Sequence, residues 1–161
     1  YGQPAYMDYK DMSPIDREEK AKGLLKEAGF GPGKPLKVEI RYNTNPNHER
    51  VATAIADMWK NTFGANVTMT NLDVASHYAY LQEGGKFNVA RAGWTADYAD
   101  PENFLALNIG NNVTFNYGKY KSEEYDALMK QSYDEQDPAK RMEIMKKAEA
   151  VSQRPWRRAY T

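Results

Sequence analysis

The chain has 161 residues, enough for one compact domain, and its 22 basic residues balance 22 acidic ones, so the formal net charge is zero. A neutral composition argues against proteins that bind nucleic acids or anionic membranes. No apolar run approaches the ~20 residues of a transmembrane helix, and the absence of cysteine excludes disulfides, thiolate nucleophiles and thiolate metal sites.

The first part of the chain predicts an extended connector, a helix and a strand. Residues 1–12 are rich in Pro and Tyr and form the connector. Ser13 before Pro14 is typical of a helix start, and Gly29 of the left-handed residue that ends a helix, so a helix is expected between them. Apolar and charged residues alternate over residues 36–42, which predicts a half-buried strand.

The middle of the chain continues as an alternation of helices and strands. The helical segments are residues 47–63, which Gly64 ends, and residues 76–83, whereas the strands are residues 67–72 and 87–94. This order predicts an α/β fold with a mixed sheet flanked by helices. Ligands of open α/β sheets bind beyond the carboxyl ends of the strands, so the loops after the first and third strands are expected to form one edge of a cleft.

The last third of the chain predicts helices separated by one long loop. Asp100 before Pro101 is expected to be an N-cap, and the short helix that it opens extends through Leu107. A loop rich in Gly and Asn then covers residues 108–120. Two more helices are expected, over residues 122–133 and 137–151.

The most informative stretch is residues 87–101, where a strand leads directly into a loop with four functional side chains. They are Arg91, Trp94, Asp97 and Asp100. Loops positioned by strands carry binding and catalytic groups, whereas packing alone does not require these residue types. Two carboxylates this close also suggest an acid/base enzyme, but the capping role of Asp100 argues against the pair, and we expect no catalytic residue. With two histidines and no cysteine, we expect no metal site.

Several segments share a pattern, in order, with one protein family. They are residues 20–30, residues 42–48, residues 58–61 with Gly64 and Val67, residues 90–98 with Pro101, Phe104 and Leu105, residues 120–122 with Tyr125 and Asp126, and residues 148–150. With these segments the chain resembles the C-terminal lobe of bacterial oligopeptide-binding proteins, which are receptors of peptide ABC transporters. The resemblance runs in register from about residue 15 to residue 151, and the order of the motifs makes it specific.

The resemblance implies part of one lobe of a two-lobed periplasmic binding protein of the type II-like class. Such a receptor closes over an extended peptide, contacts mostly the peptide backbone and performs no chemistry, so no cofactor is expected. The implied partners are an oligopeptide, the membrane permease of an ABC transporter and the remainder of the receptor chain, including its first lobe. The implied location is the periplasm, or the cell exterior with a lipid anchor if the source is Gram-positive.

The resemblance also implies roles for three residues. In this family the Asp of the motif Trp-x-x-Asp-Tyr binds the free α-amino group of the peptide, and here that residue is Asp97. The matching Trp, here Trp94, lines the peptide cleft, although a core Trp that closes the sheet edge is an equal alternative. His48 matches a histidine that faces the cleft near the C-terminal part of longer ligands, and its alternative is a solvated residue at a helix start.

Three further residues are candidates for ligand binding. Arg91 is expected to position the loop or an acidic ligand group, or to form an ordinary salt bridge. Asn45 lies in the loop after the first strand, at the predicted ligand edge. Asn112 lies in the loop at residues 108–120, where it approaches the ligand backbone or stabilises a turn.

Two matters stay open at this point. A receptor of the same superfamily that binds a dipeptide, a nickel chelate, an opine or a sugar is the main alternative function. The expected domain division is a connector at residues 1–12, an incomplete lobe domain at residues 13–151 and an atypical tail at residues 152–161. The start at Tyr1 suggests a fragment of a longer protein, and a reading-frame change would explain the tail.

Overall fold

The computed structural model of the chain describes residues 9–153. Most of the expected connector and most of the expected tail therefore lie outside the described residues, and the predicted domain division stays a prediction. In the described part, no helix has the length and apolarity needed to cross a membrane.

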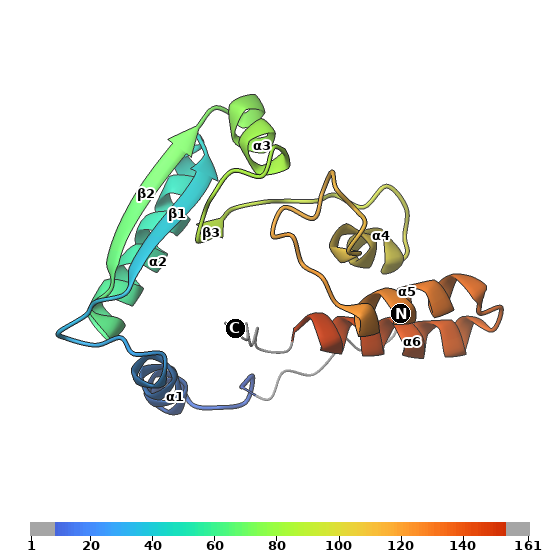
Figure 1. The fold of residues 1–161 in the computed structure, drawn as a ribbon, viewed down its shortest axis with the longest axis horizontal. Helices are drawn as coiled ribbons and strands as arrows, with labels where there is room; N and C mark the ends of the chain where they lie inside the picture. Colours follow the sequence, from blue (N-terminus) through green and yellow to red (C-terminus); the bar gives the residue numbers. More distant parts are fainter. Residues whose placement is uncertain (1–8, 154–161) are drawn as a thin grey trace. The chain divides into compact units, whose positions relative to one another are not determined.

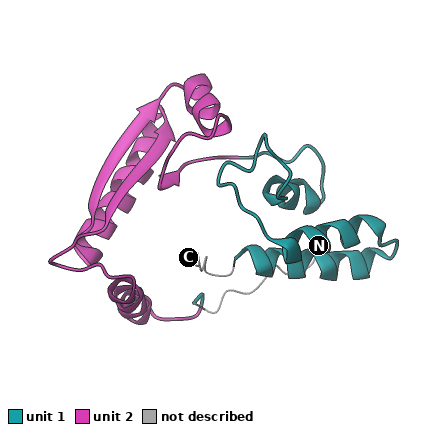
Figure 2. Cartoon of the chain, in the orientation of Figure 1, with its two compact units in different colours: residues 1–10, 94–161 teal, residues 11–93 magenta. Residues whose placement is uncertain are grey.

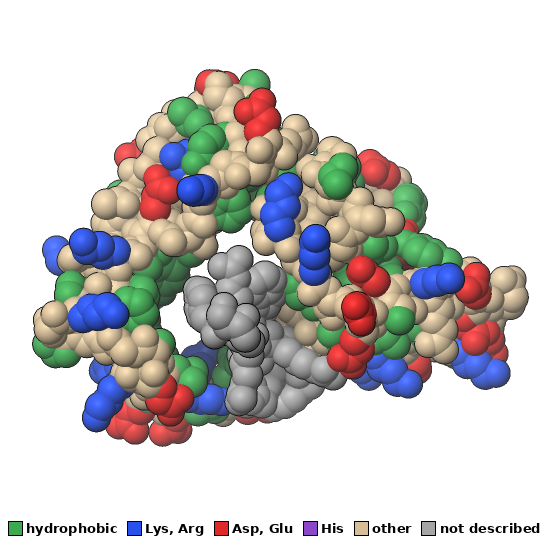
Figure 3. Space-filling view, viewed as in Figure 1, with side chains coloured by type: hydrophobic (Ala, Val, Ile, Leu, Met, Phe, Trp, Pro, Cys, Tyr) green, Lys and Arg blue, Asp and Glu red, His purple; other side chains and the backbone are tan. Residues whose placement is uncertain are grey.

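The described chain divides into two compact units (Figure 2). One unit contains residues 11–93, and the other contains residues 94–153 together with residues 9 and 10. On the face drawn in Figure 3, basic and acidic side chains are interspersed in both units, in keeping with the zero net charge.

The unit of residues 11–93 contains a parallel sheet of three strands with the order β2-β1-β3 (Figure 1). Its elements are α1 (Pro14–Glu27), β1 (Lys37–Asn43), α2 (Pro46–Phe63), β2 (Asn66–Leu72), α3 (Val74–Gln82) and β3 (Val89–Ala90). The α/β class is confirmed, but the described sheet is parallel and not mixed. The reason is that a helix joins each strand to the next and returns the chain to the same end of the sheet.

One face of the sheet packs against α2. The side chains of Val38, Ile40 and Tyr42 alternate along β1 and are buried with Ala52 of α2. Smaller contributions come from partly buried apolar residues: Leu36, Ile55, Ala56, Trp59 and Val67. The alternation that predicted a half-buried strand is therefore confirmed.

The third strand is much shorter than predicted, with two residues instead of the expected residues 87–94. The side-chain oxygen of Asn88 accepts a hydrogen bond from the backbone N–H of Glu39 at 2.8 Å, so a side chain replaces backbone pairing at the start of the strand. The backbone N–H of Arg91 still donates to the carbonyl of Arg41 at 2.7 Å, and the chain then leaves the sheet. The strand therefore ends where its backbone pairing with β1 ends.

Helix α1 begins and ends where the sequence predicts. The hydroxyl of Ser13 accepts a hydrogen bond from the backbone N–H of Asp16, and Gly29 adopts a φ of +81°. No residue of α1 is buried, however. Its residues Ala21, Leu24 and Leu25 line a hollow of about 540 Å³ within this unit, between α1, α2 and the sheet. The lining is mostly apolar and includes Leu24, Leu25, Phe30, Trp59, Phe63 and Val89.

The second unit is helical. Its elements are α4 (Glu102–Leu105), the 3-10 helix η1 (Ala106–Asn108), α5 (Glu123–Asp134) and α6 (Pro138–Ser152). Helices α5 and α6 lie side by side (Figure 1), with a core of Tyr125, Met129, Ala148 and Val151 between them. The side chains of Ser122 and Asp137 cap the two helices, as predicted. The Tyr125 hydroxyl donates to the carbonyl of Leu105 at 2.6 Å, which ties α5 to α4.

Candidate functional site

Asp97 lies on an irregular segment that leads from Trp94 to the start of α4. Its side chain is exposed, and within residues 9–153 its carboxylate makes no hydrogen bond or ion pair. A carboxylate that is free of internal partners has all its acceptor positions available for an external cation.

The backbone of Asp97 is nevertheless held in place by Asn103. The Asn103 side chain is buried, and its oxygen accepts hydrogen bonds from the indole N–H of Trp94 at 2.6 Å and from the backbone N–H of Asp97 at 3.3 Å. One amide thus orders the segment on both sides of Thr95 and Ala96. Sequence reasoning missed Asn103, because a buried amide in a short helix has no distinctive local pattern.

Trp94 is half-buried, and its ring packs against Phe115. Its ring meets Phe115 edge to face at a centroid distance of 4.8 Å. The Asn112 side chain shapes the turn that carries Phe115: its oxygen accepts the Phe115 N–H at 3.0 Å and its nitrogen donates to the Ala106 carbonyl at 3.0 Å. Trp94 therefore combines a packing contact with some exposed ring surface, and both ends of the Asn112 amide already have partners.

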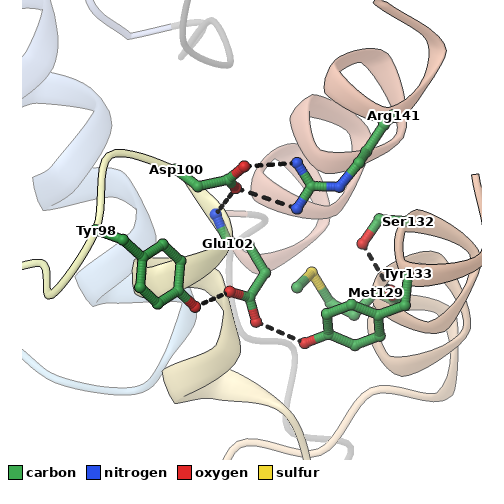
Figure 4. Close-up of polar contacts among 7 residues, drawn as sticks. All are labelled: Tyr98, Asp100, Glu102, Met129, Ser132, Tyr133 and Arg141. Atoms are coloured by element: carbon green, nitrogen blue, oxygen red, sulfur yellow. Dashed lines mark hydrogen bonds and ion pairs between the residues drawn. The ribbon is translucent and has the colours of Figure 1, made fainter. Parts of the chain in front are cut away.

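Asp100 is not the N-cap of α4, contrary to the prediction, but it contacts both the start of that helix and α6 (Figure 4). Its Oδ1 accepts the backbone N–H of Glu102 at 2.9 Å, as a capping side chain does, although the N-cap position itself is Pro101. The guanidinium of Arg141 on α6 also binds both oxygens of Asp100, at 2.6 and 3.1 Å. This hydrogen-bonded pair lowers the pKa of Asp100 and raises that of Arg141.

Glu102 connects the same region to α5. Its carboxylate accepts hydrogen bonds from the hydroxyls of Tyr98 and Tyr133, the latter at 2.8 Å (Figure 4). Burial and the bond to Glu102 raise the pKa of Tyr133 to about 12, and the bond to Glu102 raises the pKa of Tyr98. Both tyrosines therefore stay protonated donors at neutral pH.

Arg91 and His48 both contact Asn43 in the other unit, at the carboxyl end of β1. The Arg91 guanidinium donates to the side-chain oxygen of Asn43 at 3.1 Å and to the hydroxyl of Tyr78 at 3.2 Å. Nδ1 of His48 lies 3.3 Å from the Asn43 carbonyl. The expected ordinary salt bridge of Arg91 is absent from the described residues, because its hydrogen-bond partners there are neutral.

Asn45 and His77 stabilise the same unit locally. The Asn45 side chain is the N-cap of α2 and accepts the backbone N–H of Asn47 at 2.8 Å. His77 is buried, and its Nε2 lies 2.8 Å from the carbonyl of Arg91, so it donates a hydrogen bond that anchors the end of β3. Sequence reasoning gave His77 no role, because its acceptor is a backbone carbonyl 14 residues away.

The six predicted ligand residues thus form two groups, one in each unit. Trp94, Asp97 and Asn112 are linked through Asn103 and Phe115, whereas Arg91 and His48 are linked through Asn43, with Asn45 two residues further on. Among residues 9–153, no three His, Asp or Glu side chains are grouped so that they could hold a metal ion.

The family described as bacterial extracellular solute-binding proteins, family 5 Middle, matches residues 1–116. The chain belongs to this family. Among its relatives in family 5, the periplasmic oligopeptide-binding protein OppA of Haemophilus influenzae is 41% identical over 152 residues, which are 92% of this chain and 27% of that protein. The dipeptide-binding protein DppE of Bacillus subtilis is 34% identical over 94% of this chain and 28% of its own length.

Solved structures of peptide-binding proteins share the fold of the chain. The crystal structure of H. influenzae OppA in complex with the peptide RPPGFSPFR has a TM-score of 0.87 and 36% identity, and the match covers 92% of this chain and 29% of that one. The chain therefore corresponds to part of a two-lobed peptide-binding protein, as expected. It spans about a quarter of the length of the curated relatives that it matches.

Proposed function

We propose that the chain is part of a receptor that binds oligopeptides for uptake by an ABC transporter, and that Asp97 binds the α-amino group of the peptide. The observation that carries this proposal is the exposed Asp97 carboxylate, which has no internal partner within residues 9–153 although its backbone is held by Asn103. An ammonium group enclosed in a cleft needs such a partner, and a charge-assisted hydrogen bond is about twice as strong as a neutral one.

The other candidate residues support this role to different degrees. Trp94 offers the exposed part of its ring as a wall for the peptide, and Arg91 keeps a positive charge that its neutral partners do not cancel. His48 contacts the carbonyl of Asn43, whose side chain binds Arg91, and Asn45 has an exposed amide. Asn112 is the weakest candidate, because a ligand would have to replace its two turn hydrogen bonds.

The receptor would work with partners outside this chain. They are the rest of the receptor, including its first lobe, and the membrane permease of the transporter. The OppA relatives in Escherichia coli and H. influenzae are named periplasmic, so the periplasm is the proposed location, with a lipid anchor on the cell exterior as the equivalent in a Gram-positive source.

A receptor for another small ligand is the main rival, and DppE shows that close relatives are named for dipeptides. Mass spectrometry of the ligand that co-purifies with the receptor separates the two functions. A mixture of peptides of several lengths supports the proposal. A single dipeptide, nickel chelate, opine or sugar contradicts it.

The carboxylates of Asp97 and Asp100 do not form an acid/base pair in this proposal. Asp100 already accepts three hydrogen bonds, two from Arg141 and one from the backbone N–H of Glu102. Its carboxylate therefore stabilises the fold and is not available to exchange protons with a substrate. We therefore expect bound peptides to be recovered intact after prolonged incubation with the receptor, whereas hydrolysis that Asp97→Asn abolishes would favour an enzyme.

A further inference from the structure

The segment that carries Asp97 is anchored at two points. Near its start, the buried Asn103 side chain holds the Trp94 indole and the Asp97 backbone. Three residues beyond Asp97, both oxygens of Asp100 bind the Arg141 guanidinium. The Asp97 carboxylate itself has no partner among residues 9–153, so its position depends on how these two anchors hold the backbone before and after it.

The second anchor is attached to the packed helix pair of α5 and α6. Arg141 lies one turn before Ile144 on α6, and Ile144, Met145, Ala148 and Val151 are buried. The side chains of Arg141 and Asp100 are 26% and 29% exposed, so their pair is only partly open to water. A bidentate guanidinium–carboxylate contact fixes orientation as well as distance, which a single contact does not.

Glu102 attaches the same segment to the other helix of the pair. Its carboxylate accepts the hydroxyl of Tyr133 on α5 at 2.8 Å, and its backbone N–H donates to Asp100 (Figure 4). The residues directly after Asp97 are therefore tied to both α5 and α6.

We propose that Arg141 is a positioning residue for the peptide site: by clamping Asp100 it fixes the direction in which Asp97 presents its carboxylate to the amino group of the ligand. This inference rests on the proposed function of Asp97. Arg141 itself touches no ligand in it, and it acts only through Asp100.

Electrostatics and positioning predict opposite effects when Arg141 is replaced. If only charge mattered, loss of a cation near the site would strengthen the binding of a positively charged amino terminus. If Arg141 positions the segment, its loss lets Asp97 move and weakens the same interaction. The sign of the change therefore separates the two explanations.

The test measures how strongly the receptor discriminates between a tripeptide and its N-acetylated form. The measure is the dissociation constant of the acetylated peptide divided by that of the free peptide. For Arg141→Gln we expect this ratio to fall on the order of fivefold, because free-amine binding weakens and acetylated binding does not. Arg141→Lys keeps the charge but not the bidentate geometry, so it should fall between wild type and Arg141→Gln. Lys140→Gln, which removes the neighbouring exposed cation on α6, should leave the ratio unchanged.

Equal weakening of both peptides, or an unchanged or larger ratio, would overturn the inference. If Arg141→Gln does not fold, Asp100→Asn takes its place, because an amide oxygen can still accept the Glu102 N–H while the ion pair is lost. Asp97→Asn separates the two proposals. If it removes the discrimination and Arg141→Gln does not, only the positioning role fails; if it leaves the discrimination intact, the proposed function fails as well.

Discussion

Two carboxylates three residues apart have different roles because their partners differ. Asp97 has no partner within residues 9–153, whereas Asp100 binds Arg141 and the backbone of Glu102. The sequence predicted Asp100 as an N-cap, since an Asp before a Pro is a local signal, but the N-cap of α4 is Pro101 and the Asp100 side chain accepts the Glu102 N–H. The pairing of Asp100 with Arg141 was not predicted, because the two residues are 41 positions apart and a long-range ion pair leaves no local pattern.

The Asp100–Arg141 pair predicts a specific dependence of stability on pH. The pKa of Asp100 is lowered in the folded chain, mainly by the hydrogen bonds from Arg141. Its stabilisation is therefore complete above the usual Asp pKa of about 3.9, and it is lost as the pH falls through the lowered pKa of the folded state. Asp100→Asn should lower the free energy of unfolding by about 1 kcal/mol at pH 7, with the difference from wild type shrinking below about pH 4.

Urea unfolding between pH 2 and pH 7 checks this prediction. Asp134→Asn serves as a control, because Asp134 is exposed at the end of α5 and its side chain has no described partner. If the free energy of unfolding of Asp100→Asn differs from that of wild type by the same amount down to pH 2, the lost stability does not come from the ionised form of Asp100.

At the scale of elements, helices were easier to predict than strands. Ser13, Ser122 and Asp137 cap helices as their sequences indicate, because capping depends on residues within one turn. The extent of β3 depends on pairing with β1, which is distant in sequence, and the side chain of Asn88 replaces part of that pairing. The parallel arrangement likewise results from the crossovers and not from any strand by itself.

Two glycines in the same unit test the assignment of helix ends. Gly64 ends α2 with a φ of +64°, a conformation that is strained for any residue with a Cβ, whereas Gly23 lies within α1 with open space around it. Gly64→Ala should therefore cost about 1 kcal/mol, and Gly23→Ala should stabilise α1 by about 0.5–1 kcal/mol. Thermal unfolding followed by far-ultraviolet circular dichroism measures both, and a change of the same sign in the two variants would contradict the assignment.

At the scale of the whole molecule, the chain is about a quarter of the receptors that it resembles, and α1 has no buried residue. The apolar hollow of about 540 Å³ beside α1 should bind an environment-sensitive apolar dye, because apolar cavities bind apolar ligands. Leu25→Glu should reduce the dye fluorescence severalfold, since it places a charge in the lining. Ile15→Glu makes the same change on α1 outside the lining, and equal loss in both variants would contradict binding in the hollow.

The sequence motifs predicted the family and the α/β class, and they pointed to the segment around Asp97. They did not predict how that segment is held. Phe115 and Arg141 reach it from distant positions, whereas Asn103 is close in sequence but is a buried amide with no distinctive local pattern. Local patterns carry capping and periodicity, whereas these supporting contacts exist only after folding.

The most direct test of the proposed function is a cycle of four dissociation constants. The wild-type receptor and its Asp97→Asn variant are each titrated with a tripeptide and with the N-acetylated tripeptide, by isothermal titration calorimetry. If Asp97 binds the amino group, the Asp97→Asn substitution and the acetylation of the peptide should be coupled by about 2 kcal/mol in binding free energy, which is about thirtyfold in affinity. The variant should then no longer distinguish the two peptides. Additive effects of the two changes, with the variant still preferring the free amine as strongly as wild type, would contradict the role of Asp97.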